Sequence, residues 1–204
     1  MGDAAYAMPE RVNRGGLLAR GVVLLASGSA VATLAAPARA AAPPDVDLAY
    51  LRVLIGAELL KSDFHQKAIA SKRLAAKPAR LIRQLLADDK AHYNGLAALL
   101  TTTGQVPATS DDIDFSYPRG TFASQASIVK LGHALATTAL GGYLGALENV
   151  QTSQFRLPIA QVAANEAQQT GAYAQLLGRP VVGSAFAASL QIDALSAVLD
   201  AYES

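Results

Sequence analysis

Apolar residues recur three and four positions apart along four long segments of this chain, and in two of these segments a polar pair interrupts the stripe. Such spacing is typical of helices that bury one face. The second segment carries Asp89 and His92 in the middle of its stripe, and the fourth carries Glu166 and Gln169. A buried carboxylate is costly unless it is paired, hydrogen-bonded or bound to a metal ion. The pattern therefore predicts a polar or metal-binding site inside a helix bundle.

Five helices and no strand are expected, which makes the fold class all-α. We place the helices at residues 45–71, 78–100, 124–150, 157–177 and 191–202. The connection at 101–123 is rich in glycine, proline and aspartate, and loops of this length are uncommon in compact domains. We expect the second and third helices to be parallel neighbours, because the chain must then cross the full length of the bundle. Ile113, Phe115 and Tyr117 are expected to pack on the bundle and hold this crossover in place.

The ends and interiors of these helices carry further signals. Asp45 or Asp47 can cap the first helix, and Pro78 suits the first position of the second. Gly141 and Gly142 lie inside the third helix, where they are expected to permit close packing.

Residues 1–40 have the features of a signal peptide. A basic front precedes an apolar run rich in alanine and glycine, and Ala38-Arg39-Ala40 offers small residues at the two positions that signal peptidase reads. The run is shorter than the roughly 20 residues of a membrane span, so no stable span is expected after processing. We expect cleavage near Ala40 and export of residues 41–204 to the periplasm, the cell envelope or the extracellular medium. The route is either general secretion or twin-arginine export, because Arg14-Gly15 resembles a twin-arginine signal without its second arginine.

The composition of the exported part excludes some classes of function. The chain has 17 basic and 16 acidic residues; without the four basic and two acidic residues of segment 1–40, 13 and 14 remain, a net charge of −1. No basic patch is visible, so a nucleic-acid partner is not expected. The chain has no cysteine and therefore no disulfide. The partners that we expect are a second copy of the chain or another protein of the envelope.

Two helical hairpins joined by a long crossover form the arrangement of a ferritin-like four-helix bundle, here with a short C-terminal fifth helix. Residues 46–203 resemble the exported ferritin-like proteins of bacteria that are sometimes described as desiccation-related. The resemblance is carried by the stretches 56–65, with Glu58 at a ligand position, 87–92, 142–146 and 165–169, and by Asp114-Phe115 in the crossover.

The resemblance implies a centre that binds two metal ions through a Glu from one helix of each hairpin and a Glu-x-x-His motif from the other. This chain departs from that pattern at three positions. Asp89 replaces the Glu of the first motif, and Gln169 replaces the His of the second. Alignment on 142–146 places Ala136 where the third helix should offer its Glu. The di-metal site is therefore expected to be degenerate.

No catalytic residue is predicted. The expected ligands of a single divalent ion, Fe or Mn, are Glu58, Asp89, His92 and Glu166, with Gln169, His65 and His133 as weaker candidates. The same residues can instead form a metal-free hydrogen-bonded network, in which Gln169 satisfies a neighbouring carboxylate. The expected function is that of an exported, non-catalytic protein with a vestigial or mononuclear site. The alternatives are a diiron or dimanganese redox or iron-handling protein in oxidative or desiccation stress, and an envelope interaction module.

Overall fold

The computed structural model describes residues 42–204, and the signal peptide expected at 1–40 lies outside the described residues. The described part is helical, and its helices are α1 (Asp45–Ala70), α2 (Ala76–Thr102), α3 (Gln125–Asn149), α4 (Ser153–Leu176) and α5 (Ile192–Asp200). The predicted all-α class is confirmed: four long helices form a bundle and a short fifth helix follows. Within residues 42–204, none of the helices combines the length and apolar character needed to cross a membrane.

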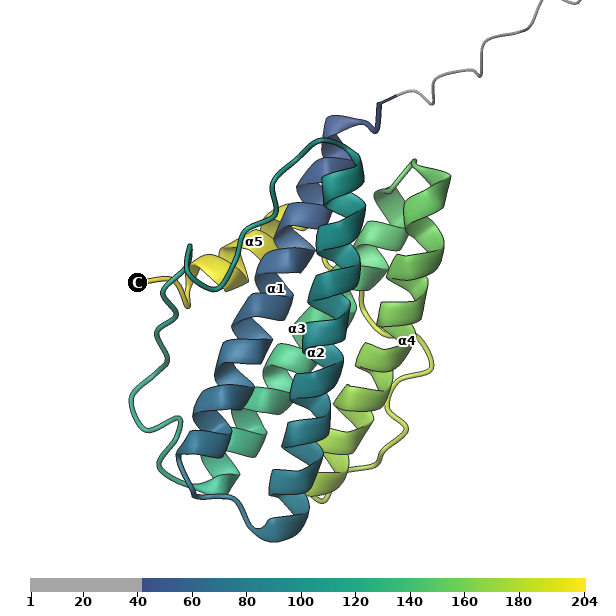
Figure 1. Ribbon diagram of the computed structural model, residues 1–204. Coiled ribbons are helices and arrows are strands. Elements are labelled where there is room, and N and C mark those ends of the chain that lie inside the picture. Colours follow the sequence, from purple (N-terminus) through teal and green to yellow (C-terminus); the bar gives the residue numbers. More distant parts are fainter. Residues whose placement is uncertain (1–41) are drawn as a thin grey trace, which may run out of the picture. The chain divides into compact units, whose positions relative to one another are not determined.

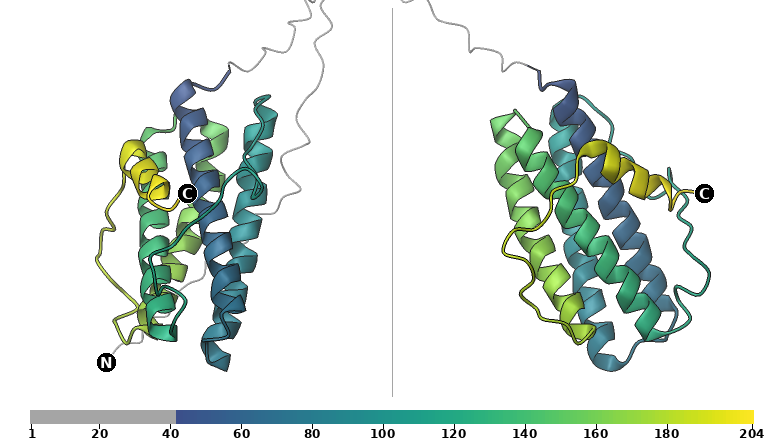
Figure 2. Two further views of the ribbon diagram at one scale, coloured as in Figure 1. Left: turned by 90° about the vertical axis from the view of Figure 1, so that its left-hand side faces the viewer. Right: turned by 180° about the vertical axis from the view of Figure 1, so that it is seen from behind.

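The four long helices pair as two antiparallel hairpins, α1 with α2 and α3 with α4 (Figures 1 and 2). Helix α1 also packs on α3, and α2 packs on α4. The expectation that the second and third helices are neighbours is wrong, because α2 and α3 lie diagonally across the bundle. They nevertheless run in the same direction, so the chain between them still has to travel the length of the bundle (Figure 1).

Helix α1 follows Pro44, and neither Asp45 nor Asp47 caps it. The carboxylate of Asp47 instead accepts hydrogen bonds from the backbone amides of Gln151, at 3.0 Å, and Thr152, at 2.6 Å. These amides lie just before α4, where the backbone N–H groups have no partner within the helix. A first-turn acid of α1 therefore stabilises the start of α4 instead of its own helix.

Two helix starts differ from the sequence expectation. Helix α2 begins at Ala76, which places Pro78 within the first turn. A backbone N–H in this turn would have no partner within the helix, so proline, which lacks this group, loses no hydrogen bond here. Helix α4 begins at Ser153, earlier than expected, and Pro158 lies inside it. The fully buried Phe155 explains the longer helix, because it extends the apolar stripe of α4 by one turn.

The crossover between α2 and α3 is fixed to the bundle by its aromatic residues. Phe115 and Tyr117 pack against the buried core, as does Ile113. The hydroxyl of Tyr117 donates a hydrogen bond to Asp63 at 2.8 Å. The predicted role of these three residues is confirmed.

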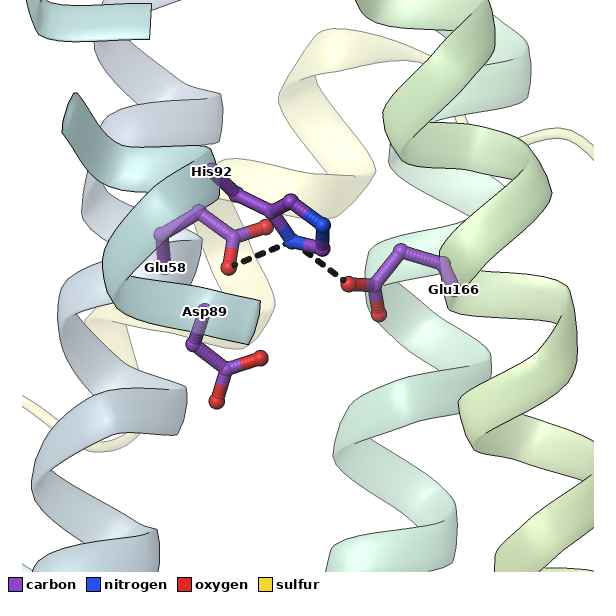
Figure 3. Close-up of side chains that lie close together, drawn as sticks. All are labelled: Glu58, Asp89, His92 and Glu166. Atoms are coloured by element: carbon purple, nitrogen blue, oxygen red, sulfur yellow. Dashed lines mark ion pairs between the residues drawn. The ribbon is translucent and has the colours of Figure 1, made fainter. Parts of the chain in front are cut away.

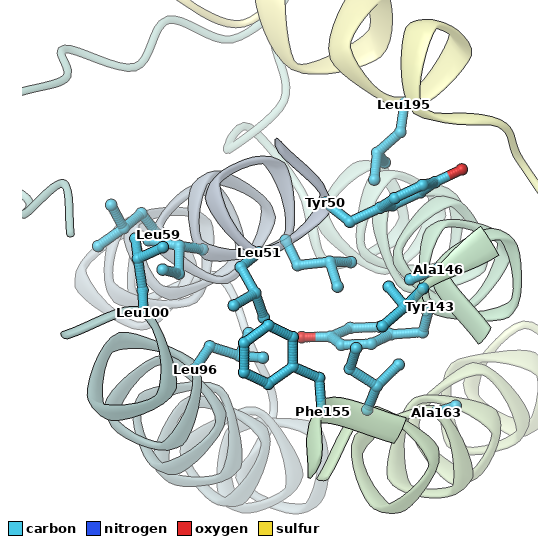
Figure 4. Close-up of a cluster of buried hydrophobic side chains, with 14 residues drawn as sticks. Tyr50, Leu51, Leu59, Leu96, Leu100, Tyr143, Ala146, Phe155, Ala163 and Leu195 are labelled. Carbon is cyan, nitrogen blue, oxygen red and sulfur yellow. The ribbon is translucent and has the colours of Figure 1, made fainter. Parts of the chain in front are cut away.

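The apolar core is divided into two clusters, and the polar residues of the candidate site lie between them. One cluster joins the start of α1 and the end of α2 to the end of α3 and the start of α4, and includes Tyr50, Leu100 and Phe155 (Figure 4). The other joins the opposite ends of the same helices and includes Phe64 and Ile82. Both ends of the bundle are thus closed by packed side chains, and the polar site lies at mid-height.

Glycines in α3 allow the segment before α5 to approach closely. The amide of Leu190 donates to the carbonyl of Gly141 at 2.8 Å. A Cβ at Gly145 would overlap the carbonyl oxygen of Leu190, and a Cβ at Gly142 would overlap the side chain of Leu195. The close packing expected at Gly141 and Gly142 is therefore present, with the C-terminal segment as the partner.

Candidate functional site

Four of the residues expected as ligands meet at the centre of the bundle. Glu58 comes from α1, Asp89 and His92 come from α2, and Glu166 comes from α4 (Figure 3). One potential ligand atom from each lies within 4.8 Å of the others. The three acids are fully buried, and the side chain of His92 is 11% exposed.

The local sequence explains why these groups converge. Asp89 and His92 are three positions apart on α2, so they lie on one face about one turn from each other. That face turns toward α1 and α4, which supply Glu58 and Glu166. Helix α3, the fourth side of the bundle, contributes no carboxylate, and its inward side chain Ala136 is buried.

A fifth charged group, Lys61, lies inside this cluster and is only 2% exposed. Its Nζ is 2.9 Å from Asp89 Oδ1 and 3.5 Å from Glu58 Oε2, and it donates a hydrogen bond to Glu166 Oε1. The ammonium therefore pairs with all three carboxylates at once. Sequence analysis did not identify this residue.

The carboxylates and the ammonium shift one another's proton affinity. Burial alone lowers the pKa of Lys61, but Glu166, Glu58 and Asp89 outweigh it and raise the pKa well above its ordinary value. Burial raises the pKa of Asp89, but Lys61 and His65 outweigh burial and lower the pKa below its ordinary value. For Glu58 the balance is reversed: burial and the nearby carboxylates raise its pKa despite the attraction of Lys61.

His92 supplies a second positive charge on the side nearest to solvent. Its Nδ1 is 3.3 Å from Glu166 Oε1 and 3.5 Å from Glu58 Oε2, within ion-pair range but outside hydrogen-bond geometry. Burial lowers the pKa of His92, and its two carboxylate neighbours outweigh burial and raise the pKa to about 9. Lys61 and His92 together face the three acids, and the raised pKa of His92 favours its charged form at neutral pH.

Two of the weaker ligand candidates hydrogen-bond to Asp89. His65 Nδ1 is 2.6 Å from Asp89 Oδ2, and its Nε2 is 2.6 Å from the hydroxyl of Tyr173. Gln169 Nε2 donates to Asp89 Oδ1 at 3.2 Å and to Asn165 at 3.0 Å. His65 and Gln169 thus orient and satisfy a carboxylate of the cluster, as a hydrogen-bonded network requires.

The third weaker candidate, His133, lies elsewhere. It is partly exposed on α3 and outside the group of four. Burial and the nearby charge of Arg179 lower its pKa. One further residue, which was not among the expected ligands, reaches the cluster: the hydroxyl of Tyr143 on α3 donates to Glu58 Oε1 at 2.5 Å.

The network leaves several buried polar atoms without a hydrogen-bond partner. These atoms are Glu58 Oε2, Glu166 Oε2, His92 Nδ1 and Gln169 Oε1. Buried polar atoms are nearly always satisfied, so each one needs an explanation. Three of them belong to the four residues that could hold a metal ion.

A dinuclear metal centre does not fit these residues. That centre takes four Glu and two His ligands in this architecture, and α3 offers Ala136 where a Glu is needed while α4 offers Gln169 where a His is needed. One metal ion would have four donors, but a metal ion such as Zn²⁺ binds carboxylate oxygens at about 2.0–2.2 Å. The ammonium of Lys61 already contacts one oxygen of each of the three carboxylates, so the set does not fit a metal ion while Lys61 stays in place.

Within residues 42–204, only the His92 side of the cluster borders solvent. A groove of about 380 Å³ lies between α2 and α4 and is lined by His92, Gly95, Leu96, Val162 and other residues of these helices. His92 forms part of its wall, so a small molecule that enters the groove meets the imidazole before the carboxylates.

Comparison with known families agrees with this architecture. Residues 46–179, more than half of the 204-residue chain, match the family described as the ferritin-like domain. No curated protein matches the chain. The match covers the four long helices and every residue of the central cluster. This chain therefore belongs to the ferritin-like domain family.

Proposed function

We propose that this protein is an exported, non-catalytic member of the ferritin-like domain family with a vestigial dinuclear centre. The observation that carries the proposal is the loss of the ligands on the α3 side. Helix α3 presents Ala136 to the core, and the ring of Tyr173 fills the space beside Gly132 one turn earlier. Packing has replaced coordination on this side of the bundle.

The remaining polar groups support a structural role. The carboxylate of Asp89 is held by Lys61, His65 and Gln169, and Glu58 is held by Tyr143. Such a network links α1, α2, α3 and α4 at mid-height of the bundle. Removing one partner from a buried charged network typically costs about 3–5 kcal/mol, because a buried charge is left uncompensated.

The test is oxidase chemistry in the mature wild-type protein. We expect the oxidation of Fe²⁺ in air, and the consumption of hydrogen peroxide with Fe²⁺ or Mn²⁺, to proceed at the rate of the metal alone. The control is a Glu58→Gln variant, which removes one donor. Turnover by the wild type that disappears in this variant would refute the proposal and favour the diiron or dimanganese alternative.

A single divalent ion, Fe or Mn, is the second candidate, and the buried atoms that lack a hydrogen bond favour it. Glu58 Oε2, Glu166 Oε2 and His92 Nδ1 are buried without a hydrogen bond, and their residues converge at the centre of the bundle (Figure 3). Together with Asp89 they would supply three carboxylates and one imidazole, a reasonable donor set for a first-row metal. This candidate requires Lys61 to leave its present position.

Export, and assignment to the bacterial desiccation-related type, belong to the same proposal. They rest on the apolar run followed by Ala38-Arg39-Ala40 and on the similarity of 46–203 to that type. N-terminal sequencing of protein recovered outside the cytoplasm should give Ala41 as the first residue. Exported material that retains Met1 would contradict cleavage after Ala40.

A further inference from the structure

We propose that the ammonium of Lys61 is the resident cation of the central cluster and that it prevents a divalent metal ion from binding there. The inference rests on the proposed function, in which the dinuclear centre is lost. It identifies the ammonium of Lys61 as the cation that takes the place of the metal ions. It predicts that loss of this single side chain turns the cluster into a metal site.

The position of Lys61 carries the argument. Its Nζ contacts a carboxylate from each of α1, α2 and α4, namely Glu58 at 3.5 Å, Asp89 at 2.9 Å, and Glu166 through a hydrogen bond. An ammonium has three protons to donate and no acceptor. A cation that joins three carboxylates from three helices performs the charge-neutralising role that a metal ion has in this architecture.

The surroundings of Lys61 offer its ammonium no other polar site. Lys61 is 2% exposed, and the void beside it measures about 10 Å³. That void is lined mainly by apolar residues, among them Leu135, Leu195 and Leu199. A displaced ammonium would lose its carboxylates and find neither water nor another acid, which is a severe penalty for a buried charge.

Removal of the ammonium should leave an unoccupied cation site. The three carboxylates and His92 would remain within 4.8 Å of one another, now without a buried lysine among them. Like charges at this distance repel in a low-dielectric interior, so binding of a divalent ion would relieve the repulsion. Glu58 Oε2 and Glu166 Oε2, which have no hydrogen bond, would then have a metal ion as partner.

The experiment compares wild type with Lys61→Met, which keeps much of the side-chain length and removes the charge. Chelated protein is titrated with Mn²⁺ and with Zn²⁺, and the bound metal and the Tm are measured. At about 100 times the dissociation constant, we expect the Tm of Lys61→Met to rise by about 5–10 °C and to fall again with EDTA. About one ion should bind to each variant chain, and the wild type should show neither bound metal nor a shift.

The matched control is Lys67→Met, the same substitution six residues further along α1. Lys67 is on the surface, with its side chain 43% exposed and paired with Asp63. This variant should behave as the wild type does toward both metals. A shift in Lys67→Met equal to that in Lys61→Met would overturn the inference, because the gain would not depend on the central cluster.

A second variant covers the case in which Lys61→Met does not fold. In Lys61→Met/Glu166→Gln the lost positive charge is balanced by a lost negative one, and Glu58, Asp89 and His92 remain as donors. The double variant decides only where Lys61→Met does not fold. Metal binding by the deciding variant, with none by the wild type, supports the inference. Stoichiometric binding by the wild type, or no binding by the deciding variant in its folded form, overturns it. Oxidase turnover by the wild type would instead refute the proposed function, so the two failures are distinguishable.

Discussion

Replacement of Asp47 tests whether an acid in the first turn of α1 secures the start of α4. Its carboxylate is fully buried and accepts hydrogen bonds from the amides of Gln151 and Thr152, 104 and 105 residues away. Hydrogen bonds to a charged group contribute about 1.5–3 kcal/mol, and Asp47→Ala leaves both amides unpaired. We expect a loss of about 3 kcal/mol, or about 6–12 °C in Tm for a domain of this size.

Two further variants test the role of the charge and of the position of Asp47. Asp47→Asn keeps one oxygen as an acceptor and should lose about 1–2 kcal/mol. Asp45→Ala removes an exposed acid from the same turn and should stay within about 0.5 kcal/mol of wild type. Thermal unfolding followed by circular dichroism at pH 7 measures all three. Equal melting temperatures for Asp47→Ala and Asp45→Ala would refute the reasoning.

The same interaction predicts a pH dependence. Burial raises the pKa of Asp47, but the hydrogen bonds from Thr152 and Gln151 outweigh it, so the folded pKa lies below the usual 3.8. A depressed folded pKa means that the stabilisation is complete above the unfolded pKa and is lost as pH falls through the folded one. The gap in Tm between wild type and Asp47→Ala should therefore be full at pH 7 and should narrow below about pH 3.8.

Three other changes have definite expected outcomes. Gly145→Ala should destabilise the protein by about 1–3 kcal/mol in a melting experiment, since the added Cβ overlaps the C-terminal segment. Gly95→Ala is the control: its Cβ would meet no atom, so this variant should be neutral or stabilising. Tyr143→Phe leaves Glu58 Oε1 without its donor and should cost about 1–3 kcal/mol by urea denaturation. His92→Gln should destabilise the protein most below about pH 6.5, because the pKa of His92 is raised to about 9 in the folded state. The loss of stability should shrink as pH rises through 9. A loss that does not change with pH would contradict the ion pairs of His92.

The position of Lys61 shows where sequence reasoning was incomplete. The expected ligands Glu58 and His65 lie on one stripe of α1, and that stripe leaves out position 61. Helix α1 packs against α2, α3 and α5, so it buries more than one face. A second stripe through Leu54, Ala57, Lys61, Phe64 and Ala68 is also buried. A lysine three residues after a ligand-type Glu, inside an otherwise apolar stripe, was the available signal.

Other features followed from the sequence more directly. Helical periodicity was sufficient for the four long helices, and the i, i+3 pairs located the polar site on α2 and α4. The diagonal placement of α2 and α3 did not follow, because loop length reports the distance that a chain must travel and not which helices touch. The contact of Asp47 with Gln151 was equally hidden, since it joins residues far apart in sequence.

Elemental analysis of mature wild-type protein, purified without chelators, decides whether Lys61 stands in place of a metal ion. If Lys61 neutralises the cluster in place of a metal ion, Fe, Mn and Zn should each be far below one ion per chain. The protein should also melt at the same temperature before and after treatment with EDTA. One or two ions per chain, removed by EDTA with a fall in Tm, would contradict the account.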